Sequence, residues 1–152
     1  MLAALTTSLL LYSAVTYFVR YSDERDSAAI AEDAAATAGD LSAAALSYTA
    51  DSVEADVNAA KSHLTGEFLA SYSELAANSI IPQATRDGII TKWEVSGTSL
   101  ISAHLGSAEA LVFLRGTVSS QVNPEPQFMT SSVRVRLEHG NDQWLIAQLE
   151  PI

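Results

Sequence analysis

The sequence contains no cysteine among its 152 residues. Disulfide bonds, zinc sites built on thiolates and a cysteine nucleophile are therefore excluded. Basic residues are also scarce, with 8 Lys and Arg against 18 Asp and Glu and a formal net charge of −10. Because a nucleic-acid-binding protein needs cations to replace the counterions of a polyanion, this composition argues against that class. The length suits a single domain of ordinary size.

Motifs that carry catalysis or hold cofactors are missing as well. The sequence has no glycine-rich phosphate loop, no G-x-S-x-G and no recognisable Ser-His-Asp arrangement. The metal-binding spacings H-x-x-x-H and H-x-H do not occur among His63, His104 and His139. Arg134 and Arg136 alternate with apolar residues, which is typical of a solvated strand face rather than an anion site. We therefore expect no catalytic residues, no metal and no cofactor.

The chain opens instead with an uncharged apolar run from Met1 to Val19. As a helix this run would be about 28 Å long, close to the thickness of the hydrocarbon core of a bilayer. A signal peptide is the competing interpretation, but no Lys or Arg precedes the run and no A-x-A cleavage site follows it. We therefore predict a transmembrane anchor over residues 1–20. The charges around the run do not decide its orientation.

Small and hydroxyl-bearing residues are frequent in this anchor. They suit close packing against another membrane helix, since they let two backbones approach. A simple tether facing lipid, with its hydroxyls bonded to the helix's own carbonyls, is the alternative. The face that we expect to contact a partner consists of Ala4, Thr7, Ser8, Leu11, Ala14, Val15 and Phe18.

The segment after the anchor, residues 21–64, is acidic, rich in alanine and free of proline. Its apolar residues recur at steps of three and four, which predicts one long helix that continues the anchor as a stalk, with a bend at Gly39. Thr65-Gly66 is the predicted stop because glycine adopts left-handed backbone angles without strain. A shorter helix is predicted over residues 67–78, and Pro82 is expected to close the helical half.

From residue 89 the apolar period changes from 3.6 to 2, which indicates strands. The predicted strands cover residues 89–95, 100–105, 108–122 with a bend at Gly116, 132–139 and 144–149. Helices followed by such a meander predict an α+β fold in which a bent antiparallel sheet wraps around helices, as in NTF2-like and cystatin-like domains. We assign residues 65–152 to the remainder of this domain.

A cone-shaped domain of this kind can enclose a pocket, which leaves a second hypothesis open. His104 shares a strand face with Leu100, and Tyr72 and Tyr48 offer hydroxyl groups, so a tethered pocket protein could bind or isomerise a small lipid. The competing interpretation places His104 at the surface and uses the tyrosines for packing. We favour the surface position for His104, because the sequence spacing places no other titratable group beside it.

Two groups of residues, at 64–68 and at 144–152, resemble the Mce-associated membrane proteins of mycobacteria and related actinobacteria. The first is the L-T-G-x-F motif, which here includes Thr65, Gly66 and Phe68 after the acidic helix. The second is the tail W-L-[IV]-x-x-[LV]-x-P-[IV], which here includes Trp144, Leu145 and Pro151. The P-x-P-Q loop at residues 124–127 is also similar.

The resemblance implies an extracytoplasmic NTF2-like domain on one membrane helix, with the N-terminus in the cytoplasm and the anchor in the plasma membrane. It implies a non-catalytic accessory subunit of an Mce-type lipid, fatty-acid or sterol import complex. The expected partners are the permease and Mce subunits of that complex, and contact with lipid is compatible with this role.

Overall fold

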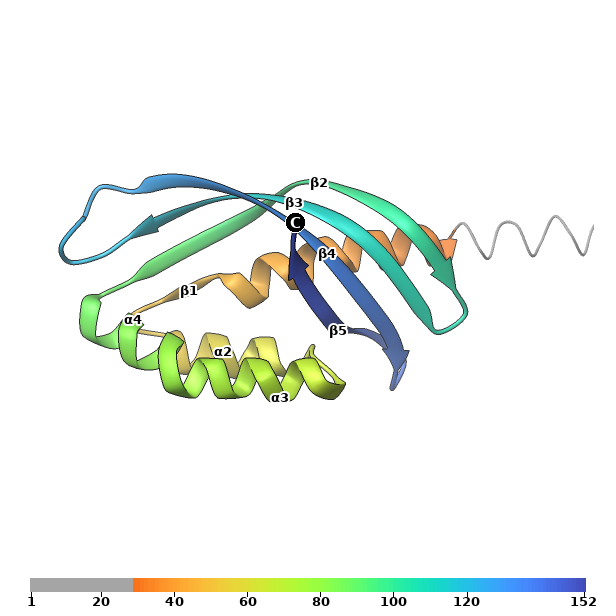
Figure 1. The fold of residues 1–152 in the computed structure, drawn as a ribbon, viewed down its shortest axis with the longest axis horizontal. Coiled ribbons are helices and arrows are strands. Elements are labelled where there is room, and N and C mark those ends of the chain that lie inside the picture. The colour runs from red at the N-terminus through yellow and green to blue at the C-terminus, as the bar shows by residue number, and fades with distance from the viewer. Residues whose placement is uncertain (1–28) are drawn as a thin grey trace, which may run out of the picture.

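The computed structural model describes residues 29–152, which form one α+β domain. Residues 29–46 are helical and are followed by β1 (Tyr48–Thr49), α2 (Val53–Lys61), α3 (Gly66–Leu75), the π-helical turn η1 (Ala76–Ile80), α4 (Ile81–Asp87), β2 (Ile90–His104), β3 (Ser107–Ser119), β4 (Gln127–Gly140) and β5 (Gln143–Pro151). The strands form an antiparallel sheet in the order β1-β2-β3-β4-β5. The sheet is curved and the helices lie on its concave side (Figure 1). The expected α+β class and bent antiparallel meander are confirmed.

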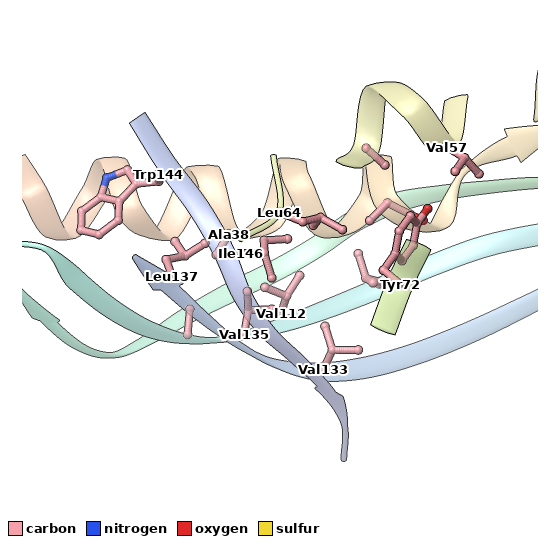
Figure 2. Packing of buried hydrophobic residues seen from close by; sticks show 14 of the residues in the cluster. Ala38, Val57, Leu64, Tyr72, Val112, Val133, Val135, Leu137, Trp144 and Ile146 are labelled. Atoms are coloured by element: carbon pink, nitrogen blue, oxygen red, sulfur yellow. The ribbon is translucent and has the colours of Figure 1, made fainter. Parts of the chain in front are cut away.

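Alternating side chains of the central strands build the core. Val112 of β3 lies beside Val133 of β4, and Ala110 lies beside Val135, all of them buried. The intervening residues Arg134 and Arg136 are exposed, as the alternation in the sequence predicted. Figure 2 shows these valines beneath the N-terminal helix. The period of two therefore located the buried face of β4 correctly.

The N-terminal helix packs directly on the sheet through small residues. Ala34, Ala38 and Ser42 are fully buried on one of its faces. Gly39 is also buried, and a Cβ atom placed on it would lie 3.1 Å from the side chains of Val95 and Thr98 in β2. The helix runs through Gly39 without interruption, so no break divides it there. Glycine suits this position because the helix approaches the sheet closely, and a larger residue would require the side chains of β2 to move.

The predicted single helix over residues 21–64 is wrong within the described chain. The helix ends at residue 46, and β1 separates it from α2. Residues 29–46 form part of the folded domain rather than a stalk, because their inner face is buried against the sheet. The portion of this prediction that covers residues 21–28, and the anchor at 1–20, lie outside the described residues.

The last carbonyl groups of this helix accept hydrogen bonds both from the residue that follows it and from distant parts of the chain. The last four carbonyl groups of a helix need partners outside it. Here Ser47 supplies two, from its Oγ to the Ala43 carbonyl at 2.7 Å and from its backbone N–H to the Ala44 carbonyl at 3.3 Å. The carbonyl groups of the last two residues, Ala45 and Leu46, accept hydrogen bonds from the Tyr72 hydroxyl (2.9 Å) and the Thr91 hydroxyl (2.6 Å).

Two further boundaries differ from the predictions. Pro82 does not end the helical half: α3, η1 and α4 follow one another without a break, and Pro82, which has no N–H to donate, comes just after the π-helical turn η1. The two segments predicted over residues 89–105 form the single strand β2, which is interrupted by irregularities between Val95 and Gly97 and between Leu100 and Ser102. Gly116 of β3 keeps the register with β2 and β4, and its missing Cβ atom leaves room for the ring of Trp93.

Candidate interaction site

The residues expected to contact a partner in the membrane lie outside the described chain. They are Ala4, Thr7, Ser8, Leu11, Ala14, Val15 and Phe18. Within residues 29–152, no helix combines the length and the apolar character needed to cross a membrane.

The two family motifs lie next to each other in the fold, although about eighty residues separate them in the sequence. Leu64 forms a parallel bridge with Ile146 of β5. The backbone N–H of Thr65 donates to the Ile146 carbonyl at 3.0 Å, and the Ile146 N–H donates to the His63 carbonyl at 2.8 Å. Leu64 and Ile146 are both buried (Figure 2). The L-T-G segment therefore covers part of the otherwise open edge of β5.

Trp144 connects the tail motif to the N-terminal helix. Its ring is 6% exposed, and its indole N–H donates a hydrogen bond to a carboxylate oxygen of Asp33 at 3.0 Å. The ring also meets His139 edge to face, with centroids 5.0 Å apart. Leu145, the next residue, is half-buried, while Pro151 is exposed at the end of β5 opposite Val133. Of these tail residues, Trp144 has the clearest structural role.

The remaining motif residues start α3. Thr65 is extended, and Gly66 has a left-handed φ of +57°, a conformation that glycine adopts without the strain of a Cβ atom. This turn redirects the chain from the edge of β5 into α3. Phe68 is half-buried in α3 and packs near Tyr72, with ring centroids 6.2 Å apart. The motif thus helps to place the tyrosine that caps the N-terminal helix.

Tyr72 is the most buried tyrosine of the described chain. Burial raises the pKa of its hydroxyl, and the nearby Tyr48 and Asp56 raise it further. Its hydroxyl donates to the Ala45 carbonyl, which fixes the neutral form in the folded protein. Burial also raises the pKa of Tyr48. Both groups therefore favour the folded state only while they remain protonated.

We expect stability to fall above about pH 10 as the tyrosines of the unfolded chain ionise first. Tyr72→Phe should lower the free energy of unfolding by about 0.5–1.5 kcal/mol at pH 7, because the bond to Ala45 is lost. The difference in the free energy of unfolding between parent and variant should become smaller at higher pH. The parent loses stability there as Tyr72 ionises in the unfolded chain, and the variant has no such group at position 72. Urea unfolding at pH 7 and above pH 10 measures this. A gap that stays constant would contradict the assignment.

The structure does not bring His104 together with the two tyrosines of the pocket hypothesis. His104 is exposed at the far end of β2 and pairs with Ser107. Tyr48 pairs with Thr91, at the opposite end of the same strand. No group of three or more metal-ligating side chains occurs within residues 29–152. The arrangement that would let His104 act with a tyrosine on a bound lipid is therefore absent from the described chain.

A groove on the sheet is the most distinctive surface feature that sequence reasoning missed. It has a volume of about 530 Å³ and lies at the end of the sheet where the connection between β3 and β4 begins and ends. Phe128 at its edge is 89% exposed and Met129 is 47% exposed. The lining residues are Lys92, Glu94, Arg115, Gly116, Thr117, Phe128, Met129 and Thr130. Large exposed apolar side chains beside a recess are typical of an interaction site.

Charge around the groove differs from that of the whole chain. Lys92 and Arg115 contribute two cations and Glu94 one carboxylate, in a protein with a net charge of −10. Arg115 pairs with Glu94 at 3.3 Å, and both side chains are well exposed. The groove contains neither a histidine nor a second carboxylate, so it suits binding better than acid–base chemistry. The sequence signal was the pair Phe128-Met129 directly after a proline-containing loop.

Comparison with known proteins gives sequence relatives in Mycobacterium tuberculosis, among them the uncharacterized protein Rv1362c, which is 32% identical over 130 residues that cover 86% of this chain and 59% of that protein. The chain is 36% identical over 128 residues to the outer membrane protein Rv1973 of Mycobacterium tuberculosis, an alignment that covers 84% of this chain and 79% of that protein. No family model matches the chain.

Solved structures share the fold at low sequence identity. An IcmL-like type IV secretion system protein from Legionella pneumophila has a TM-score of 0.64 and 12% identity, with 78% of this chain and 90% of that chain covered. The periplasmic domain of DotI has a TM-score of 0.61 and 12% identity, with 78% and 92% covered. At these identities the likeness concerns the fold alone.

Proposed function

Because the chain belongs to the family of the mycobacterial outer membrane protein Rv1973, we propose that it is a membrane-anchored, non-catalytic subunit of an envelope complex. Its specific role in this proposal is to bind and stabilise or adapt an Mce-type importer of lipids, fatty acids or sterols. The L-T-G-x-F motif and the tryptophan-containing tail support this assignment through their resemblance to Mce-associated proteins.

The observation that carries the proposal is the groove beside Phe128. A phenylalanine that is 89% exposed at the rim of a recess contributes little to the core of its own domain. An aromatic side chain of this kind commonly anchors a protein interface. The partner in this proposal is an extracytoplasmic part of the importer, and the two cations suit an acidic segment of it.

The proposed position in the membrane is supported by the sequence and by the similar proteins. The apolar run at residues 1–19 is taken as a single plasma-membrane anchor, with the N-terminus in the cytoplasm and the domain outside. The mycobacterial relative is named as an outer membrane protein, and the DotI domain that shares the fold is periplasmic. Both support a membrane-associated domain outside the cytoplasm.

Substitutions in the anchor test the proposal through recovery of the complex. Ser8→Leu and Ala14→Leu would push a partner helix away, and loss of about 1–2 kcal/mol of helix packing lowers recovery roughly tenfold. Ser13→Leu is the matched control, because residue 13 lies on the opposite face of the same predicted helix. Recovery of permease and Mce subunits with each tagged variant from native membranes is the measurement.

Full recovery with Ser8→Leu and Ala14→Leu would contradict docking through this face. Equal loss with all three variants would show that the effect is not specific to the predicted partner face. Membrane levels of the tagged chain, measured in the same preparations, separate these results.

A further inference from the structure

The β2–β3 hairpin ends in an apolar residue that its turn does not require. His104 and Ser107 pair, so the turn consists of Leu105 and Gly106. Gly106 takes the unusual backbone conformation, with φ of +119°, while Leu105 is 93% exposed. Turn tips are usually polar because they face water. Ile101 on the same strand is 48% exposed, at the irregularity between Leu100 and Ser102.

The neighbouring β4–β5 hairpin has a polar turn. The β4–β5 turn consists of Asn141 and Asp142, both with positive φ (52° and 59°), as expected for polar residues in a tight turn. It lies next to the β2–β3 turn, because the His139 N–H donates to the Gly106 carbonyl at 2.9 Å. Of the two adjacent turns, only the one containing Leu105 has an apolar tip.

A chain of contacts places both turns at the end of the domain where the described chain begins. Gly106 accepts a hydrogen bond from the His139 N–H, and the ring of His139 meets the ring of Trp144, with centroids 5.0 Å apart. Trp144 in turn bonds to Asp33 at 3.0 Å, in the first part of the N-terminal helix. The start of this helix and the β2–β3 hairpin lie at the same end of the domain (Figure 1). The groove beside Phe128 lies towards the other end of the sheet.

The length of chain before residue 29 limits how far this end can lie from the membrane. Nine residue-to-residue steps separate residue 29 from Arg20, where the apolar run ends. They span about 14 Å if helical and at most about 32 Å if extended. We propose that Leu105 rests in the interfacial layer of the membrane from which the chain emerges. This inference depends on the anchor of the proposed function.

A weak contact is sufficient for this arrangement. The anchor holds the domain at the bilayer, so the second contact forms at a high effective concentration. The hairpin and the anchor together would fix the tilt of the domain. They would point the groove away from the lipid and towards other extracytoplasmic proteins.

The absence of cysteine makes the test direct, since one introduced cysteine gives one label. The full chain carrying Ser107→Cys is labelled with an environment-sensitive fluorophore and reconstituted into vesicles of phosphatidylethanolamine and phosphatidylglycerol. Val122→Cys, on the β3–β4 connection and 83% exposed, is the control at the opposite end. Nitroxide-bearing lipids should quench the label at position 107 several-fold more than the label at 122. Adding Leu105→Asn should reduce quenching at 107 to the control level.

Three results would overturn the inference or its premise, and they are distinguishable. Equal quenching at 107 and 122 in a chain that resists alkaline extraction overturns the membrane contact and leaves the anchor intact. Unchanged quenching after Leu105→Asn overturns the assignment to this side chain. Release of the chain by alkaline extraction overturns the anchor itself and with it the proposed function.

Discussion

The Trp144→Ala variant is expected to lose about 3–5 kcal/mol of its free energy of unfolding. The indole is 6% exposed, packs against His139 and holds the N-terminal helix through Asp33. Its removal leaves a cavity between the helix and the sheet and an unpaired carboxylate at Asp33. Urea unfolding measures the loss. It is followed by circular dichroism rather than by fluorescence, because Trp93 would be the only tryptophan left in the variant.

Two milder variants separate the contributions of packing and hydrogen bonding. Trp144→Phe keeps most of the ring but removes the N–H donor, so we expect a loss of about 1 kcal/mol beyond the smaller ring volume. Asp33→Ala should show a similar loss, and combining it with Trp144→Phe should cost less than the sum. A Trp144→Ala variant as stable as the parent would contradict the proposed link between the tail and the helix.

Gly39→Leu is expected to destabilise the domain by about 1–3 kcal/mol or more, although leucine is the better helix former by nearly 1 kcal/mol. A Cβ atom alone would already approach Val95 and Thr98 to 3.1 Å, and the rest of the leucine has no space. The helix must therefore move away from β2. Thermal unfolding of the variant beside the parent measures the effect.

Ala36→Leu provides the matched control for Gly39→Leu. Residue 36 is exposed on the same helix, so leucine should leave stability unchanged within about 0.5 kcal/mol. A Gly39→Leu variant as stable as this control would show that the helix does not depend on close approach to the sheet.

The boundaries of β4 and of the N-terminal helix illustrate what the sequence could and could not predict. The alternation of Val133, Val135 and Leu137 with charged residues predicted β4 and its buried face. The end of the N-terminal helix was missed because the apolar period continues past Leu46. The last two carbonyl groups of the helix accept hydrogen bonds from Thr91, 45 residues away, and Tyr72, 27 residues from its partner Ala45.

Contacts between residues far apart in the sequence also limited how much of the candidate site could be predicted. The resemblance identified Thr65 and Trp144 as parts of two motifs, but not that Leu64 bridges to Ile146 beside them. The groove was missed because its sequence signal, two apolar residues after a proline-containing loop, does not indicate a recess. It arises only when β3 and β4 pair and bring Thr117 opposite Phe128. The irregularities in β2 broke its alternation and made one strand read as two.

The arrangement suggests how the domain would act within a complex. In our proposal, the anchor and the Leu105 hairpin lie at the membrane, and the Phe128 groove faces away from it. The N-terminal helix, held by Trp144 and Tyr72, connects these two ends. A rigid domain of this kind would present its groove at a fixed distance and tilt from the bilayer.

Purification of the tagged full chain from native membranes in mild detergent, followed by mass spectrometry, tests the central claim most directly. We expect stoichiometric recovery of Mce proteins, permease and ATPase with the parent chain. We expect reduced recovery with Phe128→Asp, and parent-like recovery with Val122→Asp, whose side chain is similarly exposed outside the groove lining. Recovery of the chain alone, under conditions that keep an Mce complex intact, would contradict the claim.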